Sequence, residues 1–338
     1  MMIPFIQKLA RGEHLSLDES RQAMREIMEG RAGPAQIAAY LTALSIKHPT
    51  PDEIAGAALV MREKATRIEV GDLPVVDTCG TGGTGKKTFN ISTCAALVAA
   101  GAGAYVAKHG NRGATSKCGS SDVLELLGVN VHASPAIVAR CIREVRMGFL
   151  FAPELHGAMK YAVPVRREIG IRTIFNLLGP LTNPAGAQRQ VMGVFAADLV
   201  RPIADVLLTL GAVHALVVHS ADGLDEIVLS APTHVCEVRG GAVTCYDLSP
   251  EVLGLPPSGL EALRIETAAE SAAAIRAVLA GERSPRRDVV LANAGAATYV
   301  AGVARDLFDG IARAGESIDS GAAGRVLEAL VRLSHVAG

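Results

Sequence analysis

The sequence has no tryptophan, only 4% aromatic residues and almost no net charge. A formal net charge of −1 over 338 residues argues against a protein whose main task is to bind nucleic acid, because phosphate neutralisation requires a basic excess. Of the residues, 49% are hydrophobic and 35 are glycine, which indicates a folded, soluble protein rich in small residues. This composition excludes disorder and collagen-like repeats.

Long apolar runs are also missing. The most apolar segment, residues 94–107, is too short for a membrane-spanning helix and is interrupted by Gly101 and Gly103. Residues 1–10 lack the basic start, apolar middle and small-residue cleavage site of a secretory signal. We therefore expect a cytoplasmic protein.

The six cysteines are spread through the chain, and no two of them form a Cys-x-x-Cys motif. Their wide spacing predicts neither a zinc site nor a disulfide framework. We expect small buried residues or loop thiols at all six positions, which are Cys79, Cys94, Cys118, Cys141, Cys236 and Cys245.

Residues 1–70 show only helical patterns. A capping box at 16–19 begins a first helix, and Gly30 stands where that helix should end. Pro34 begins a second helix over 34–44, and Thr50 caps a third. We expect a small helical domain over 1–70, joined by parts of 165–190.

Residues 71–338 are predicted to form an α/β domain with a mainly parallel central sheet. Short β runs alternate with helical patterns at 75–76, 104–107, 149–152, 191–195 and 215–219. Residues 235–246 alternate around Gly240-Gly241, which predicts a hairpin at the sheet edge. Residues 171–190 have few periodic positions and are expected to form a long ordered loop.

A glycine-rich loop, residues 77–88, lies between a predicted strand and a predicted helix. Backbone amides and a helix N-terminus converge on anions at such places, so phosphate binding is the natural inference. Asn90, Ser92 and Thr93 add an amide and two hydroxyls at the start of the helix. These groups favour a ligand over a glycine-rich turn that binds nothing.

Two other phosphate motifs fit this loop poorly. Gly80, Gly82 and Gly85 match a dinucleotide-binding pattern, but the acidic residue expected about 20 positions further on is missing. Gly80, Gly85 and Lys86 match most of a Walker A motif, but Lys87 stands where that motif requires serine or threonine. The loop therefore indicates another kind of phosphate ligand.

Two further polar segments follow predicted strands. Residues 108–120 begin with Lys-His-Gly-Asn-Arg and are rich in donors, so two neighbouring strands end in donor-rich loops at one edge of the sheet. This arrangement suits a polyphosphate sugar better than a single phosphate. Asp225 and Glu226 follow the strand that ends at His219, and adjacent carboxylates there are best explained as ligands of Mg²⁺.

Four segments together resemble the anthranilate phosphoribosyltransferase family across nearly the whole chain. They are residues 80–93, 108–112, 166–184 (with the core GIRTIFNLLGPLTNP) and 222–226. The resemblance implies a helical domain hinged to an α/β domain of the nucleoside phosphorylase and phosphoribosyltransferase kind, a homodimer and a step in tryptophan biosynthesis. It implies transfer of phosphoribose from phosphoribosyl pyrophosphate to the amine of anthranilate, with two Mg²⁺ ions.

The resemblance also implies site residues. Around phosphoribosyl pyrophosphate it places Gly80, Gly83, Thr84, Thr88, Asn90, Ile91, Ser92, Thr93, Lys108, Asn111, Ser116 and Ser120. Around anthranilate it places Gly80, His109, Asn111, His156 and Arg166. Magnesium is expected on Ser92, Asp225 and Glu226, and the catalytic residues are expected to be Lys108, Asp225 and Glu226.

The expected chemistry needs charge stabilisation more than proton removal. The leaving pyrophosphate gains negative charge, which magnesium and lysine can offset. An arylamine is already neutral near pH 7, so no obligatory general base is expected. The family usually has aspartate where Thr84 stands, Ser-Val-Ser at 113–115 and a second histidine where Leu155 stands. A relative with another aromatic acceptor, or a nucleic-acid-binding paralogue, is the alternative.

Overall fold

The computed structural model describes residues 1–113 and 118–336. Its N-terminal part contains α1 (Ile3–Ala10), α2 (Leu17–Met28), α3 (Pro34–Lys47) and α4 (Pro51–Lys64). The capping boxes predicted at Ser16 and Thr50 are present, and Gly30 has a left-handed φ of 72° just beyond α2. The prediction of three helices was wrong, because α1 precedes them.

A seven-stranded sheet forms the centre of the rest of the chain. Its strands are β1 (Val75–Asp77), β2 (Tyr105–Gly110), β3 (Met147–Phe151), β4 (Arg189–Gly193), β5 (His214–Ser220), β6 (Thr233–Arg239) and β7 (Ala242–Leu248). The spatial order is β3-β2-β1-β4-β5-β6-β7. All pairs from β3 to β5 are parallel, and β6 and β7 are antiparallel. The predicted α/β class and edge hairpin are confirmed.

Helices cover both faces of the sheet. One face packs against α5 (Ile91–Gly101) and α14 (Pro285–Val300), and outside these lie α13 (Ala268–Leu279), α15 (Leu307–Asp319) and α16 (Ala322–Ser334). The other face packs against α7 (Pro135–Val145) and α11 (Val200–Thr209). The short α6 (Ser120–Leu126) and α12 (Pro250–Leu253) complete this part. Within the described chain, no helix is long and apolar enough to cross a membrane.

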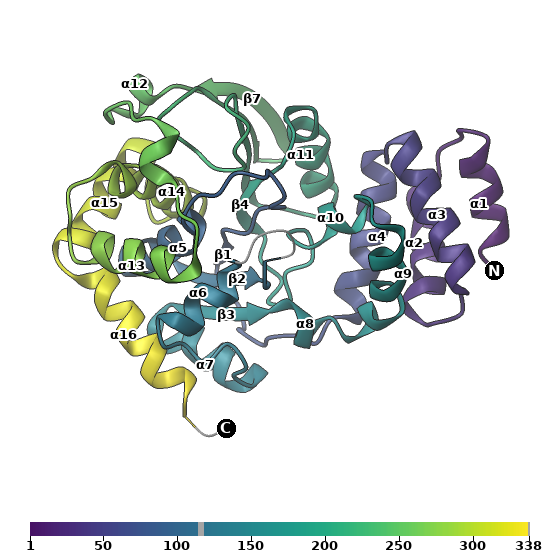
Figure 1. Cartoon of the computed structure of the whole chain (residues 1–338), viewed down its shortest axis with the longest axis horizontal. Coiled ribbons are helices and arrows are strands. Elements are labelled where there is room, and N and C mark those ends of the chain that lie inside the picture. The colour runs from purple at the N-terminus through teal and green to yellow at the C-terminus, as the bar shows by residue number, and fades with distance from the viewer. Residues whose placement is uncertain (114–117, 337–338) are drawn as a thin grey trace.

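A connecting segment returns from the α/β part to the helical bundle. It contains α8 (Ala152–Leu155), α9 (Val163–Ile169) and α10 (Phe175–Leu178). Helix α9 contacts α3, α10 contacts α4, and Figure 1 shows both beside the bundle at the opposite end of the molecule from α13–α16. The expected loop at 171–190 therefore contains a helical turn, and β4 begins before its end.

The cysteine prediction was wrong for one pair. Cys236 on β6 and Cys245 on β7 lie directly opposite each other and form a disulfide. Cys94 and Cys141 are buried thiols, as expected, and Cys79 and Cys118 are partly buried. The disulfide lies in the edge hairpin, whose inner strand buries Cys236 and whose outer strand exposes Cys245.

Candidate active site

The predicted polar segments meet at the carboxyl edge of the sheet, where β1 and β4 lie side by side. Chain connections leave these two neighbouring strands in different directions, which is where ligands bind in open parallel sheets. The glycine-rich loop follows β1, and the segment with Asp225 and Glu226 follows β5. The structure thus brings together side chains separated by well over a hundred residues.

Backbone hydrogen bonds hold the glycine-rich loop against β4 and the acidic segment. The amide of Thr81 donates to the carbonyl of Gly193 at 2.8 Å, and the amide of Gly82 donates to Oδ2 of Asp225 at 2.9 Å. Gly82, Gly83 and Gly85 have φ values of 62°, 79° and 74°, which only glycine adopts readily. Loops with such turn conformations can direct successive backbone amides into an anion-binding concavity.

Glycine is needed at positions 80 and 193 because the glycine-rich loop, β4 and Asp225 approach one another closely there. A Cβ atom on Gly80 would lie 2.9 Å from Oδ2 of Asp225 and 3.2 Å from the carbonyl of Gly193. A Cβ on Gly193 would overlap the backbone of Asp225. Glycine within a strand often indicates that another backbone approaches closely. The position of Gly193 in a predicted strand therefore indicated a supporting residue, which was not among the predicted site residues.

Lys108 reaches the same place from β2. Its buried ammonium group donates to the carbonyl of Thr78 at 3.2 Å, to Oγ1 of Thr78 at 3.1 Å and to Oγ of Ser92 at 3.4 Å. The Thr78 hydroxyl in turn donates to the carbonyl of Ser92 at 3.1 Å. A positive charge is therefore fixed at the junction between the glycine-rich loop and the start of α5.

The acidic pair lies in a buried setting. Burial raises the pKa of Asp225, and burial together with the neighbouring Asp225 raises the pKa of Glu226 to about 8. Asn293 on α14 donates to the carbonyl of Ile227 at 2.7 Å and accepts from its amide at 3.1 Å, which fixes the backbone next to the acids. A small cavity lies beside the acids and the start of the loop, and it is lined by Thr78, Gly80, Ser92, Ala95, Val191, Gly193, Val218, Asp225, Glu226 and Asn293.

These groups fit a magnesium ion. Two carboxylates and the Ser92 hydroxyl line one cavity and offer only oxygen ligands, which Mg²⁺ prefers. Burial disfavours the ionised form of both carboxylates, and for Glu226 the neighbouring Asp225 adds to this effect, so a cation bound here would stabilise the ionised pair. Asp77, Cys79 and His109 also lie within 4.8 Å of one another, but both oxygens of Asp77 already accept hydrogen bonds.

Asp77, the last residue of β1, supports the site through hydrogen bonds. Burial raises its pKa to about 6, and its carboxylate accepts from the amide of His109 at 3.1 Å and from Nδ2 of Asn183 at 2.7 Å. Asn183 also donates to the carbonyl of Ala107 at 2.8 Å. Asn183 thereby ties the connecting segment to the end of β1 and to the middle of β2, and the sequence had not indicated this for Asp77 or Asn183.

His109 and His156 form a buried pair. The Nδ1 atom of His109 lies 3.1 Å from the carbonyl of Gly179, so it must carry the proton and donate. Its Nε2 atom is then an acceptor for Nε2 of His156, 3.2 Å away. Burial lowers the pKa of His109 to about 3, with His156 adding to the effect, and burial lowers that of His156 to about 4. The two rings are therefore neutral at physiological pH.

Arg166 lies on α9, in the connecting segment. Its guanidinium carbon is 5.1 Å from the ring centroid of Phe175, and partial burial lowers its pKa. Arg166 comes from the part of the chain packed on the helical bundle, whereas His109 comes from β2. The predicted anthranilate residues therefore belong to both parts of the molecule.

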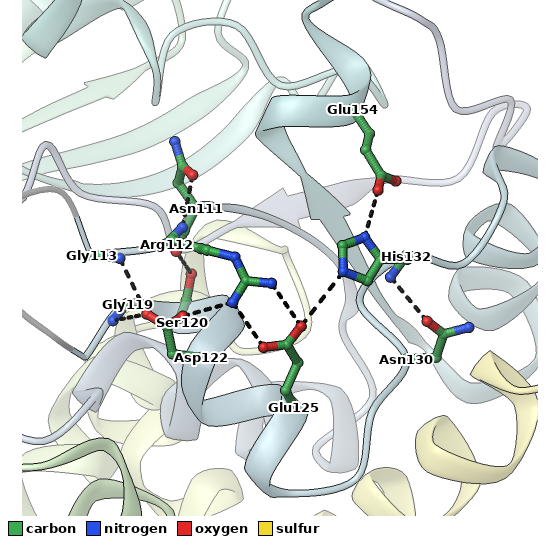
Figure 2. Close-up of polar contacts among 10 residues, drawn as sticks. All are labelled: Asn111, Arg112, Gly113, Gly119, Ser120, Asp122, Glu125, Asn130, His132 and Glu154. Atoms are coloured by element: carbon green, nitrogen blue, oxygen red, sulfur yellow. Dashed lines mark hydrogen bonds and ion pairs between the residues drawn. The ribbon is translucent and has the colours of Figure 1, made fainter. Parts of the chain in front are cut away.

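Hydrogen bonds to Asp122 hold together the two ends of the second donor loop, which follows β2, as Figure 2 shows. Oδ2 of Asp122 accepts from the amides of Gly113 at 3.2 Å and Gly119 at 2.8 Å, and its Oδ1 accepts from Arg112 at 2.9 Å. The hydroxyl of Ser120 donates to the carbonyl of Asn111 at 3.3 Å, so these two predicted residues lie side by side. Ser116 lies outside the described residues.

The remaining predicted residues lie in the glycine-rich loop or at the start of α5. Asn90 accepts from Ser271 at 2.7 Å and from the Cys118 thiol at 3.0 Å, while Thr84 accepts from the amide of Lys86 at 3.3 Å. The side chains of Ile91 and Thr93 are buried, and the amide of Ile91 donates to the carbonyl of Phe89. Thr88 pairs with Arg264 in an isolated β-bridge, so the glycine-rich loop is also anchored at its far end.

Comparison with family models defines the class of protein. The model of the glycosyl transferase family a/b domain matches residues 72–324, and the model of the helical bundle domain of the same family matches residues 3–65. Together they cover nearly the whole chain. The protein is therefore a glycosyltransferase of the two-domain kind that combines a helical bundle with an α/β domain.

Similar proteins narrow this class. Anthranilate phosphoribosyltransferases from Methylobacillus flagellatus and Symbiobacterium thermophilum are 53% and 55% identical to this chain, and the alignments cover at least 98% of each chain. The enzyme from Thermus thermophilus has a crystal structure with a TM-score of 0.93 at 46% identity, covering 98% of this chain and 99% of that one. The chain belongs to the anthranilate phosphoribosyltransferase family.

A more distant relative has been solved with ligands. The Saccharomyces cerevisiae enzyme in complex with phosphoribosyl pyrophosphate and magnesium has a TM-score of 0.88 at 26% identity, with 98% of this chain and 97% of that one covered. The same yeast enzyme has also been solved in complex with 4-fluoroanthranilate.

Proposed function

We propose that this chain transfers the phosphoribosyl group of phosphoribosyl pyrophosphate to the amine of anthranilate and releases pyrophosphate, as a step of tryptophan biosynthesis. The observation that carries the proposal is the shared cavity between the glycine-rich loop and the Asp225-Glu226 pair, with the Lys108 ammonium fixed on Thr78 and Ser92. Phosphate-binding amides, a buried cation and metal-binding oxygens meet there. The ligands of the yeast relative, phosphoribosyl pyrophosphate and magnesium, fit this set of groups.

The pyrophosphate end of the substrate belongs on the glycine-rich loop and Lys108. Amides of the loop bind phosphate oxygens, while Lys108 offsets the charge that builds up as the carbon–oxygen bond to pyrophosphate breaks. Asn111, Ser116 and Ser120 on the second loop hold the sugar phosphate. Among the residues implied by the resemblance, Ile91 acts by shaping the start of α5, since its side chain is in the core and its amide is already bonded.

Magnesium is held by Asp225, Glu226 and the Ser92 hydroxyl, and we propose two ions in the working enzyme. When bound, magnesium supplies positive charge that stabilises the departing pyrophosphate. The protein contributes by keeping both acids buried beside the loop, where Asn293 fixes the backbone and Asp225 also holds the amide of Gly82. Asp225 therefore positions the loop as well as the metal.

The acceptor binds between the two parts of the molecule. Arg166 offers a planar pair of donors to the anthranilate carboxylate, and Asn111, Gly80 and the His109–His156 pair line the same place. The arylamine attacks the sugar carbon as the bond between that carbon and pyrophosphate breaks, and the nitrogen then releases one of its two protons to water. Both histidines are neutral, so anthranilate is held without a second cation beside its amine.

One assay tests the function. Pyrophosphate release should require phosphoribosyl pyrophosphate, magnesium and anthranilate together, and the product should show the fluorescence of an N-substituted anthranilate. Release with another aromatic amine or acid, but not with anthranilate, would contradict the proposed acceptor. A nucleic-acid-binding paralogue would release no pyrophosphate with any of these acceptors.

We also propose that the functional units are a helical domain of residues 1–70 with parts of 165–190 and an α/β domain of residues 71–338. The packing of α9 and α10 on α3 and α4 supports the inclusion of the connecting segment in the first unit. A homodimer and a cytoplasmic location, both implied by the family, complete the proposal. Light scattering of the purified protein tests the dimer, and cell fractionation tests the location.

A further inference from the structure

Arg172 connects three separate parts of the molecule. Its guanidinium donates to the carbonyl of Gly83 in the glycine-rich loop and lies 4.5 Å from the ring centroid of Phe195, just after β4. Its backbone carbonyl accepts a hydrogen bond of 2.8 Å from the hydroxyl of Ser45 on α3. One residue of the connecting segment therefore contacts the helical bundle, the sheet edge and the phosphate loop.

The contact with Gly83 fixes the orientation of a peptide group. The carbonyl and the following amide of a trans peptide point in opposite directions. With the Gly83 carbonyl turned toward Arg172, the amide of Thr84 points away from Arg172. Gly82, Gly83 and Gly85 carry no side chains that could limit rotation of their peptides, so an outside contact has a large effect on their orientation.

The other contacts of Arg172 keep its guanidinium in place. A planar guanidinium can stack on Phe195 and still donate from its edge, which the compact ammonium of lysine cannot do in the same way. Phe195 lies two residues beyond Gly193, whose carbonyl already holds the amide of Thr81. The first half of the loop is thus tied to one end of β4 at two points, directly at Thr81 and through Arg172 at Gly83.

We propose that Arg172 is a positioning residue for the phosphate loop, and that it transmits the position of the helical bundle to this loop through Ser45. It sets the direction of the Thr84 amide before phosphoribosyl pyrophosphate binds. This inference rests on the proposed binding of that substrate by the loop. Its consequence is that the bundle, which contributes to the acceptor side, also influences affinity for the sugar substrate.

Hydrogen exchange of the ligand-free protein tests the positioning directly. Loss of one hydrogen bond should make exchange of the amides at 82–86 roughly fivefold to tenfold faster in Arg172→Ala, measured on the millisecond scale. Arg172→Lys should lie between wild type and Arg172→Ala. Arg167→Ala, which removes an exposed arginine from the same segment, should exchange like wild type. Unchanged exchange in Arg172→Ala would overturn the proposal.

Steady-state kinetics test the link to substrate binding. Arg172→Ala should raise KM for phosphoribosyl pyrophosphate about tenfold while KM for anthranilate stays within about twofold. Ser45→Ala should raise the same KM about twofold to threefold, but should add nothing in the Arg172→Ala background, because residues that act through one another are not additive. Additive effects would overturn the link to the bundle.

Two further outcomes separate this proposal from others. A raised KM for phosphoribosyl pyrophosphate with unchanged exchange in the free protein would show that the guanidinium binds the phosphate itself, and would overturn the positioning role. If the wild-type protein showed no transfer to anthranilate, the proposed function would be wrong. The exchange measurement would still test whether Arg172 positions the loop, because it uses the ligand-free protein.

Discussion

The candidate site divides into two proposed halves that differ in electrostatic character. We call the first the pyrophosphate half, which comprises residues 80–85, Ser92, Lys108, Asp225 and Glu226. The second is the acceptor half, which comprises His109, His156 and Arg166. The pyrophosphate half is rich in charge and is built within the α/β part, whereas the acceptor half contains two neutral rings and spans both parts of the molecule.

A single strand separates these halves. Lys108 and His109 are consecutive residues of β2, so their side chains point to opposite faces of the sheet. Lys108 reaches Thr78 and Ser92 near α5, and His109 reaches Gly179 and His156 in the connecting segment. The pyrophosphate half suits a leaving group that gains negative charge, and the neutral histidine pair of the acceptor half suits an amine that must stay unprotonated. Variants should therefore affect one substrate more than the other.

The largest effect is expected from removing the acids of the pyrophosphate half. Asp225→Asn with Glu226→Gln should lower kcat by roughly three orders of magnitude, since the metal contributes several kcal/mol of charge stabilisation. The fold should remain, as circular dichroism can check. Asp222→Asn is the matched control, because that carboxylate is already engaged by the hydroxyls of Ser220 and Ser230. Near-normal activity of the double variant at millimolar magnesium would show that the metal is bound elsewhere.

The arginine of the acceptor half should show the opposite selectivity. Arg166→Ala should raise KM for anthranilate about tenfold to a hundredfold, because a lost charge-assisted pair costs roughly 1.5 to 3 kcal/mol. KM for phosphoribosyl pyrophosphate should change little. The exposed neighbour Arg167 provides the control variant, Arg167→Ala. Equal effects on both substrates would mean that Arg166 does not belong to the acceptor half.

The buried histidines predict how stability responds to acid. Their folded-state pKa values, about 3 for His109 and about 4 for His156, lie below that of an unfolded histidine. The unfolded chain therefore takes up protons first, and stability is lost as pH falls from about 6.5 toward 4. Each histidine should contribute a slope of up to about 1.4 kcal/mol per pH unit in the free energy of unfolding.

Urea unfolding across this pH range measures the effect. His156→Gln should flatten the slope, whereas His335→Gln, at an exposed position near the C-terminus, should leave it as in wild type. A slope that is unchanged in His156→Gln would mean that the ring is protonated in the folded protein. The contrast between the charged pyrophosphate half and the neutral histidine pair of the acceptor half would then be lost.

Local patterns predicted most of the pyrophosphate half. Glycine spacing, the strand-to-helix transition and a lysine at the end of the next strand are all short-range signals. The same kind of signal was present for the disulfide and was not used. Cys236 and Cys245 lie symmetrically about Gly240-Gly241, so a hairpin with a two-residue turn places them opposite each other, as the register shows.

Short-range sequence patterns could not predict the residues that support the two halves from distant parts of the chain. Asn293 meets Ile227 across 66 positions, Asn183 meets Asp77 across 106, and His156 meets His109 across 47. These contacts depend on which helix packs on which strand, and no periodicity in one sequence encodes that. Helix α1 was missed for a local reason, since no side chain caps its N-terminus and its first residues are mostly apolar.

The smallest effect is expected for the second donor loop, which follows β2 and includes Asn111 and Ser120. Its size tests whether that loop belongs to the pyrophosphate half. Asp122 fastens the neck of the loop by accepting from the amides of Gly113 and Gly119, and Arg112 bridges it to Glu125 (Figure 2). Asp122→Asn keeps the size of the side chain but removes its charge and one acceptor oxygen. The loss of about 1 kcal/mol of hydrogen bonding should raise KM for phosphoribosyl pyrophosphate roughly fivefold, with a smaller change for anthranilate. Glu154→Gln, at the far end of the same network beside His132, should leave both values near those of wild type. Equal increases in KM for both substrates in Asp122→Asn would place the loop in both halves, because Asn111 at its start is proposed to contact both ligands. The two halves would then be distinct only at β2, where Lys108 and His109 point to opposite faces of the sheet.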